Sequence, residues 1–253
     1  MVEDLHSHTY YSFCGGDDPM QLIETAIAGG IEVFGICDHN CGIGHHRGTT
    51  EFPDRAAEIY DYQRAVNAYL QHMRLLSEHY RDRITLLCGI EVATCDVKGV
   101  RLPKEIDISG FDYCLIEHID TPTTEVDDLF AFRKRCGTPR AGIAHTDLFS
   151  YFAQKGFDPL AFFTRMAEEK IFWEMNVNYD SIHAYREHAY VIDFFADEEK
   201  QKIVKQSGVE ISVGFDGHRL KDYAPDRVKN ACKRLEELGL PMPFASLAKK
   251  NGD

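Results

Sequence analysis

The sequence predicts an α/β fold in which parallel strands alternate with helices and close into one barrel. Strand-like apolar runs and segments of helical periodicity follow each other along the chain, as expected for a parallel sheet with right-handed crossovers. The runs are almost continuously apolar, which indicates strands that are buried on both faces. The length of 253 residues is typical of a parallel α/β barrel, which has roughly 250 residues.

Side chains that can bind metals follow the strand-like runs, and this placement favours the closed barrel over a doubly wound open sheet. The outer strands of an open sheet lie too far apart to share one site, whereas a barrel brings the carboxyl ends of all its strands to one rim. We therefore expect a metal site at that rim, built from His6, His8, His39, Glu91, His118, His145, Asp216 and His218.

The predicted elements follow each other in a regular order. A short strand precedes His6, and Asp18 with Pro19 predicts the start of a helix that ends at Gly29 and Gly30. We expect further strands at 33–36, 84–90, 113–116, 141–144, 170–176 and 209–215, and helices at 53–80, 124–136, 159–170, 197–207 and 225–239. Long loops are expected at about 40–52, 96–110 and 177–196. No repeat or linker interrupts this order, so we expect a single barrel domain spanning residues 1–253.

The composition disfavours several classes of protein. The formal net charge of −13 at pH 7 argues against a nucleic-acid surface, because phosphate backbones are bound by clustered Lys and Arg. No apolar run reaches the length of about 18 residues that suggests a membrane span, and we expect no signal peptide at the N-terminus. The eight cysteines form no C-x-x-C pair, and several lie in apolar strands, so we expect reduced thiols in a cytoplasmic protein. The oligomeric state has no signal in the sequence.

The candidate ligands indicate more than one divalent metal ion. His6 and His8 occupy alternate positions of an extended segment, so their imidazoles lie on the same side. Asp216 and His218 repeat this spacing. A carboxylate such as Glu91 after a buried strand must be paired or bound to metal, and its two oxygens can bridge two ions. His, Asp and Glu together suit Zn²⁺, Mn²⁺ or Fe²⁺ rather than Ca²⁺. About eight ligands exceed the four of one tetrahedral ion, so we expect two or three metal ions.

These residues carry a family resemblance. The motifs Asp-Leu-His-Ser-His-Thr, Cys-Asp-His-Asn, Gly-Ile-Glu-Val and Phe-Asp-Gly-His, with His118 and His145 between them, resemble the polymerase and histidinol phosphatase (PHP) superfamily. They follow the family's order from residue 4 to 218, and Trp-Glu-Met-Asn at 173–176 is similar to a strand of the histidinol-phosphate phosphatase branch. The resemblance implies a distorted, TIM-like (β/α)7 barrel with a trinuclear metal site that hydrolyses phosphate esters.

The resemblance also implies a ligand set. The first metal would be held by His6, His8, Glu91 and Asp216, the second by Glu91, His118 and His145, and the third by His39 and His218. The family usually supplies a further His or Asp about six residues after the second His, where this chain has Cys14. Cys14 could coordinate as a thiolate, the loop at Gly15 and Gly16 could bring Asp17 into place, or the third metal could be weak or absent. We favour Asp17, because a hard carboxylate suits such a cluster.

Five further residues have hypothetical roles in catalysis. Asp38 is expected to orient a ligand histidine by accepting its second ring N–H. Arg186 and Arg219 are candidate phosphate clamps, because guanidinium binds phosphate oxygens bidentately. His46 and Arg47 lie in a loop that could close over the substrate.

The function expected from these patterns is a metal-dependent phosphoesterase that acts on a small phosphomonoester, with histidinol phosphate as the best single candidate. Bound metal ions would activate a water for attack on phosphorus and neutralise the phosphate oxygens. The alternatives are the same site acting on a nucleotide, a sugar phosphate or a cyclic phosphodiester, an exonuclease, which the acidic charge disfavours, and a non-catalytic metal-binding barrel.

Overall fold

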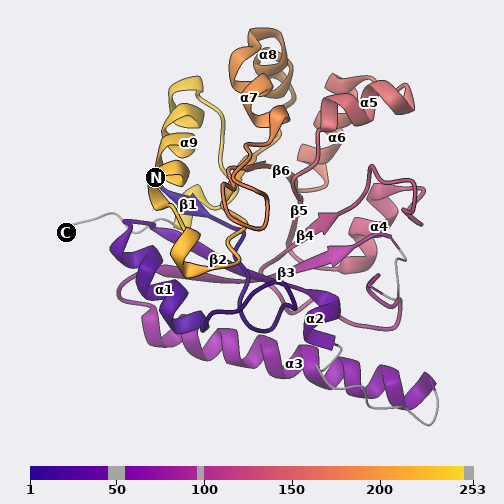
Figure 1. Ribbon diagram of the computed structural model, residues 1–253. Helices are drawn as coiled ribbons and strands as arrows, with labels where there is room; N and C mark the ends of the chain where they lie inside the picture. The colour runs from indigo at the N-terminus through magenta and orange to yellow at the C-terminus, as the bar shows by residue number, and fades with distance from the viewer. Residues whose placement is uncertain (45–54, 96–99, 248–253) are drawn as a thin grey trace.

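The computed structural model describes residues 1–44, 55–95 and 100–247 of the chain. Within these ranges, seven parallel strands form one sheet in the order in which they occur along the chain (Figure 1). The strands are β1 (Glu3–Asp4), β2 (Val33–His39), β3 (Thr85–Ala93), β4 (Tyr113–Glu117), β5 (Arg140–Ile143), β6 (Ile171–Asn176) and β7 (Ile211–Gly214). The sheet closes almost completely, because the Leu5 amide donates to the Val213 carbonyl oxygen at 2.9 Å and the Asp216 amide donates to the His6 carbonyl oxygen at 2.6 Å. The predicted α/β barrel is confirmed.

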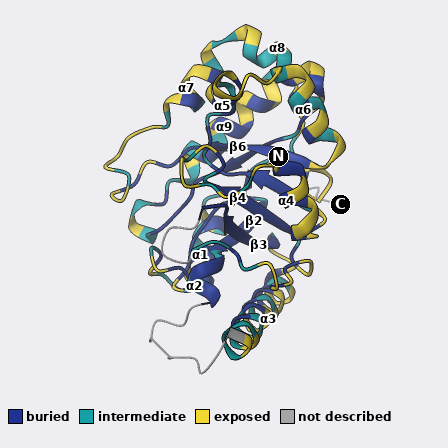
Figure 2. Cartoon of the chain, turned by 90° about the vertical axis from the view of Figure 1, so that its right-hand side faces the viewer, coloured by how far each residue is buried: buried dark blue, intermediate teal, exposed yellow. Residues whose placement is uncertain are grey.

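Helices surround the strands, and their exposed faces form the outside of the molecule (Figure 2). They are α1 (Pro19–Ala28), α2 (Asn40–Gly44), α3 (Arg55–Tyr80), α4 (Leu129–Cys136), α5 (Leu148–Lys155), α6 (Pro159–Glu168), α7 (Ala189–Ala196), α8 (Glu198–Ser207) and α9 (Pro225–Leu238), with 3-10 turns η1 (Leu220–Asp222) and η2 (Ala245–Leu247). Among the described residues, no helix has the length and apolar character that a membrane span requires.

The structure differs from the predicted elements at several places, and helix capping explains two of them. The helix expected from residue 124 begins only at Leu129, because the side chain of Asp128 accepts from the amides of Phe130 and Ala131 and caps the helix there. The segment expected as a loop at 177–196 ends in the helix α7. The unpredicted helix α5 begins after Asp147, whose carboxylate accepts from the Ser150 amide.

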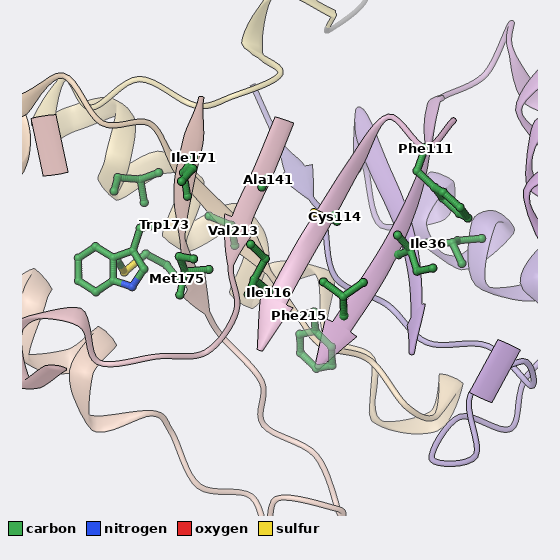
Figure 3. Packing of buried hydrophobic residues seen from close by; sticks show 14 of the residues in the cluster. Ile36, Phe111, Cys114, Ile116, Ala141, Ile171, Trp173, Met175, Val213 and Phe215 are labelled. Carbon is green, nitrogen blue, oxygen red and sulfur yellow. The ribbon is translucent and has the colours of Figure 1, made fainter. Parts of the chain in front are cut away.

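The core has an outer and an inner part. The outer part lies between the barrel and the helices, and Figure 3 shows its members Trp173, Met175 and Val213 beside one another. The inner part fills the barrel below the site and contains Leu5, Val33, Cys37, Leu87, Tyr113, Leu115, Ala144, Phe172 and Phe244. Its centre is the fully buried Tyr113, whose hydroxyl donates to the Leu5 carbonyl oxygen at 2.5 Å.

Glycines on two strands make room for the Tyr113 ring. A Cβ at Gly35 would lie 2.1 Å from its hydroxyl oxygen, and one at Gly89 would lie 2.5 Å from its ring. The interior is therefore packed with side chains, and polar groups collect at the rim where the strands end.

Candidate metal centre

The strands that line the apolar interior of the barrel also place polar side chains at its rim. Side chains alternate between the two faces of a strand, so the inward positions Cys37, Gly89 and Leu115 are followed two residues later by His39, Glu91 and Glu117. His39 is paired in register with Glu91 on the neighbouring strand. Seven of the nine predicted ligands belong to groups whose ligand atoms lie within 4.8 Å of one another, namely His6, His8, His39, Glu91, His145, Asp216 and His218.

Three predicted ligands have a backbone conformation that is rare for residues other than glycine. The φ angles are 65° at His118, 25° at His145 and 54° at Asp216. Each residue directly follows a strand or lies shortly after one, so the left-handed turn changes the direction of its side chain at the rim. Such strained conformations cluster at functional sites.

The first group of donors is formed by His6, His8, Glu91 and Asp216. The Nε2 atoms of His6 and His8 lie 3.2 Å apart. Asp216 Oδ1 is 3.0 Å from Nε2 of His8 and 3.6 Å from Nε2 of His6. Glu91 Oε2 lies 3.3 Å and 3.5 Å from the same two nitrogens.

The hydrogen bonds behind the two rings determine which nitrogens carry protons. Nδ1 of His6 lies 2.7 Å from Glu174 Oε1, so it is the donor. Nδ1 of His8 lies 3.2 Å from Ser12 Oγ, and the Ser12 hydroxyl donates to Asp38 Oδ1 at 2.6 Å, so that its oxygen accepts from His8. In the neutral tautomer that metal binding requires, both Nε2 atoms would direct lone pairs at each other and at two carboxylates. A divalent cation between these four donors removes the repulsion, so the residues fit a metal ion.

Glu91 fits a second ion beside the first. Its carboxylate is completely buried, and within the described part of the chain Oε2 has no hydrogen-bond partner. Nδ1 of His39 lies only 2.9 Å from that oxygen, but the contact lacks hydrogen-bond alignment. Burial raises the pKa of Glu91, but His39 and His6 outweigh it and hold this pKa well below the usual range. Oε1 faces the other way, 3.3 Å from Nε2 of His145, as a bridging carboxylate requires.

The second group contains a carboxylate that the sequence analysis did not assign. Glu91, Glu117 and His145 offer ligand atoms within 4.8 Å of one another. The predicted ligand His118 does not join this group; its Nε2 lies 3.0 Å from Glu117 Oε2, and its side chain is 39% exposed. The signal that could have identified Glu117 is its even spacing from the inward-facing Tyr113.

The third group contains Cys14 and not Asp17. The sulfur of Cys14 lies with nitrogens of His8 and His218, all within 4.8 Å of one another. Asp17 lies outside every such group in the described residues, because its Oδ2 accepts from the Leu220 amide at 2.7 Å and holds the start of η1.

Carboxylates orient the imidazole rings of the candidate ligands, and Asp38 acts on such a ring only indirectly. Glu174 accepts from His6, and Asp180 Oδ2 lies 3.2 Å from Nδ1 of His218. Asp38 is out of phase with the inward positions of β2, so it accepts from the amides and hydroxyls of Thr9 and Ser12 instead. Its link to His8 therefore runs through Ser12.

The candidate phosphate clamps differ in position. Arg219 is partly buried and lies against the loop after β1, since a Cβ at Gly16 would be 2.0 Å from its Nη1. Arg186 is exposed in the loop between β6 and α7. His46 and Arg47 lie outside the described residues.

The structure is a parallel α/β barrel. Imidazoles and carboxylates at its strand ends form a candidate metal centre. The PHP domain matches residues 4–238, so the chain belongs to the PHP domain family. The resemblance stated from the motifs is confirmed.

One solved structure agrees with this fold at a TM-score above 0.5. The chain is similar to a histidinol phosphate phosphatase from Lactococcus lactis that was solved with zinc, L-histidinol and phosphate, with 14% identity, 95% of each chain covered and a TM-score of 0.58. It is also similar to a protein from Listeria monocytogenes whose assignment as a histidinol phosphatase is provisional, with 13% identity, 95% and 92% of the two chains covered and a TM-score of 0.42. No curated protein matches the chain.

Proposed function

We propose that the chain is a metal-dependent phosphoesterase that hydrolyses a small phosphomonoester, with histidinol phosphate as its substrate, and that the whole chain acts as one catalytic domain. The observation that carries this proposal is the convergence of His6 Nε2, His8 Nε2, Glu91 Oε2 and Asp216 Oδ1 on one point. Family membership and the zinc, L-histidinol and phosphate bound in the Lactococcus lactis enzyme support it.

Different residues at the rim would hold the metal ions, orient the ligand rings and bind the phosphate. His6, His8, Glu91 and Asp216 would hold one ion, and Glu91, Glu117 and His145 a second, with His118 behind Glu117. Bound divalent ions supply an activated water and neutralise charge on the phosphate oxygens. Arg219, which lies against the loop after β1, would bind a phosphate oxygen. Glu174 and Asp180 would keep His6 and His218 in the tautomer that presents a lone pair to the centre.

The substrate proposal is tested with a panel of phosphate esters. The purified protein is stripped of metal, reloaded with Zn²⁺, Mn²⁺ or Fe²⁺, and assayed for phosphate release from histidinol phosphate, sugar phosphates, nucleotides, a cyclic phosphodiester and p-nitrophenyl phosphate. We expect the highest kcat/KM with histidinol phosphate, and a loss of about 10³-fold or more in His6→Ala, because the charge stabilisation by the ion is lost. His79→Ala, on the exposed outer side of α3, is the matched control and retains activity.

Three results would count against the proposal in different ways. Preference for another ester would replace the substrate and keep the reaction. Full activity in His6→Ala would remove the metal centre from the mechanism. Metal binding without turnover on any ester would leave a non-catalytic metal-binding barrel.

A further inference from the structure

Cys14 differs from every other cysteine in the chain. The remaining seven of the eight cysteines are buried, whereas Cys14 has intermediate exposure. Its sulfur lies with nitrogens of His8 and His218 inside one group of candidate ligand atoms. The ring of His218 stacks on that of His8, with a centroid distance of 4.8 Å. A sulfur beside two imidazole nitrogens is a donor set for a metal and not a packing position.

The loop that carries Cys14 is fixed on both sides of the residue. Ahead of it, the Ser12 amide donates to the Thr9 carbonyl oxygen at 3.1 Å, and Ser12 is also bound to Asp38. After it, Gly15 passes so close to Thr9 that a Cβ would lie 2.1 Å from the Thr9 carbonyl oxygen. The backbone therefore holds the sulfur in place.

Asp17 cannot substitute for Cys14 without breaking other contacts. Its carboxylate is bound to the Leu220 amide, and its own carbonyl oxygen accepts from the Tyr10 amide at 3.0 Å. Moving the carboxylate to the rim would release the start of η1. The geometry therefore selects the thiol over the carboxylate at this position.

We propose that Cys14, as a thiolate, ligates a metal ion together with His218, and that this sulfur makes the position selective for Zn²⁺ over Mn²⁺. The inference rests on the metal centre of the proposed function. Thiolate sulfur and imidazole nitrogen are the ligands that Zn²⁺ prefers in protein sites. Soft thiolate selects Zn²⁺, whereas oxygen-rich sites accept Mn²⁺. On binding, the S–H bond breaks, the proton passes to solvent, and the sulfur donates the electron pair to the ion.

Cobalt substitution tests the sulfur ligand without an activity assay. Co²⁺ replaces Zn²⁺ in the stripped full-length protein, and a cobalt–thiolate bond gives a near-ultraviolet sulfur-to-metal charge-transfer band. We expect this band in the wild type and in Cys232→Ala, whose buried sulfur donates to the Glu3 carbonyl oxygen at 3.4 Å. We expect it to be absent in Cys14→Ser and Cys14→Asp, with circular dichroism confirming that both variants are folded.

Metal competition tests the selectivity. In Cys14→Asp, a hard ligand takes the place of the sulfur. Elemental analysis of protein equilibrated with both ions should show that the ratio of bound Zn²⁺ to Mn²⁺ falls by roughly tenfold or more. Even a residue that only hydrogen-bonds to a metal ligand changes metal affinity by roughly 10–100-fold. A charge-transfer band that persists in Cys14→Asp, its absence from the wild type, or an unchanged metal ratio would overturn the proposal. A wild-type band without phosphatase activity would keep the sulfur ligand and refute the proposed function.

Discussion

Glu174 Oε1 lies 2.7 Å from Nδ1 of His6, on the side of the imidazole that faces away from the metal centre. The other oxygen of the same carboxylate accepts from the His145 amide at 2.8 Å. One buried side chain on β6 therefore positions a ligand ring after β1 and the backbone of a ligand after β5. Buried acceptors of this kind keep a ligand histidine in one tautomer and one orientation.

Replacing this carboxylate should weaken metal binding without removing a ligand. We expect Glu174→Gln to lower metal affinity by roughly 10–100-fold, because the amide can present an N–H to Nδ1 of His6 and shift its proton to Nε2. Isothermal titration of the stripped protein with Zn²⁺ measures the change. Glu78→Gln, at an exposed site on α3, is the control. An affinity equal to wild type in Glu174→Gln would show that the contact does not orient His6.

Metal removal should destabilise the fold. An ion that is bound only to the folded state adds about 2.7 kcal/mol of stability per site at 100 times its Kd. We therefore expect the Tm to fall on chelation and to recover with Zn²⁺. In Glu91→Ala, which lacks the carboxylate between the two groups of donors, the Tm difference between stripped and loaded protein should largely disappear. An equal difference in wild type and Glu91→Ala would contradict the bridging role.

Replacing Asp38 should mainly lower the stability of the fold, and its effect on metal binding should be secondary. Its carboxylate accepts from two amides and two hydroxyls of Thr9 and Ser12. Asp38→Ala leaves these donors without partners, and we expect a loss of about 2–5 kcal/mol in the free energy of unfolding, since each unsatisfied buried group costs about 1–3 kcal/mol.

Ser12→Ala separates the two effects of this network. It removes the acceptor of His8 Nδ1 but leaves both Thr9 contacts of Asp38 intact. We expect a smaller stability loss in denaturant titrations and a loss of metal affinity of roughly tenfold. A variant with normal metal affinity would exclude the link from Asp38 through Ser12 to His8.

Glu3 should give the stability a pH dependence that is independent of the metal centre. Burial, followed by the charge of Glu210, raises the pKa of Glu3 well above its ordinary value of 4.5. The folded state therefore keeps a proton that the unfolded state releases. Its stabilising contribution is complete below about pH 4.5 and is lost as the pH rises through the folded pKa.

The neutral variant Glu3→Gln tests this prediction. Its free energy of unfolding, measured by denaturant titration from about pH 5 to pH 8, should rise relative to wild type as the pH rises, by up to about 1.4 kcal/mol per pH unit. The same titration of Glu78→Gln should run parallel to wild type. Parallel curves for Glu3→Gln would mean that the carboxyl is not protonated in the folded protein.

The fold and most of the rim were predictable from the sequence because period-two alternation and strand ends are local signals. His6 and His8, or Asp216 and His218, are recognisable by spacing alone. The same periodicity would have identified Glu117 and placed Asp38 on the outer face of β2. By contrast, the choice between Cys14 and Asp17 depends on the contact of Asp17 with Leu220, 203 residues away. The distant pairing of Glu174 with His6 is equally invisible in the linear sequence.

Metal titration with a simultaneous phosphate assay tests the central claim most directly. Stripped protein receives Zn²⁺ in known increments, bound metal is counted by elemental analysis, and phosphate release from histidinol phosphate is measured at each step. The account predicts that stripped protein is inactive and that activity rises as the donors around Glu91 fill, with His6→Ala failing to recover. Activity in the stripped protein, or full occupancy of two or three ions without phosphate release from any phosphomonoester, would contradict it.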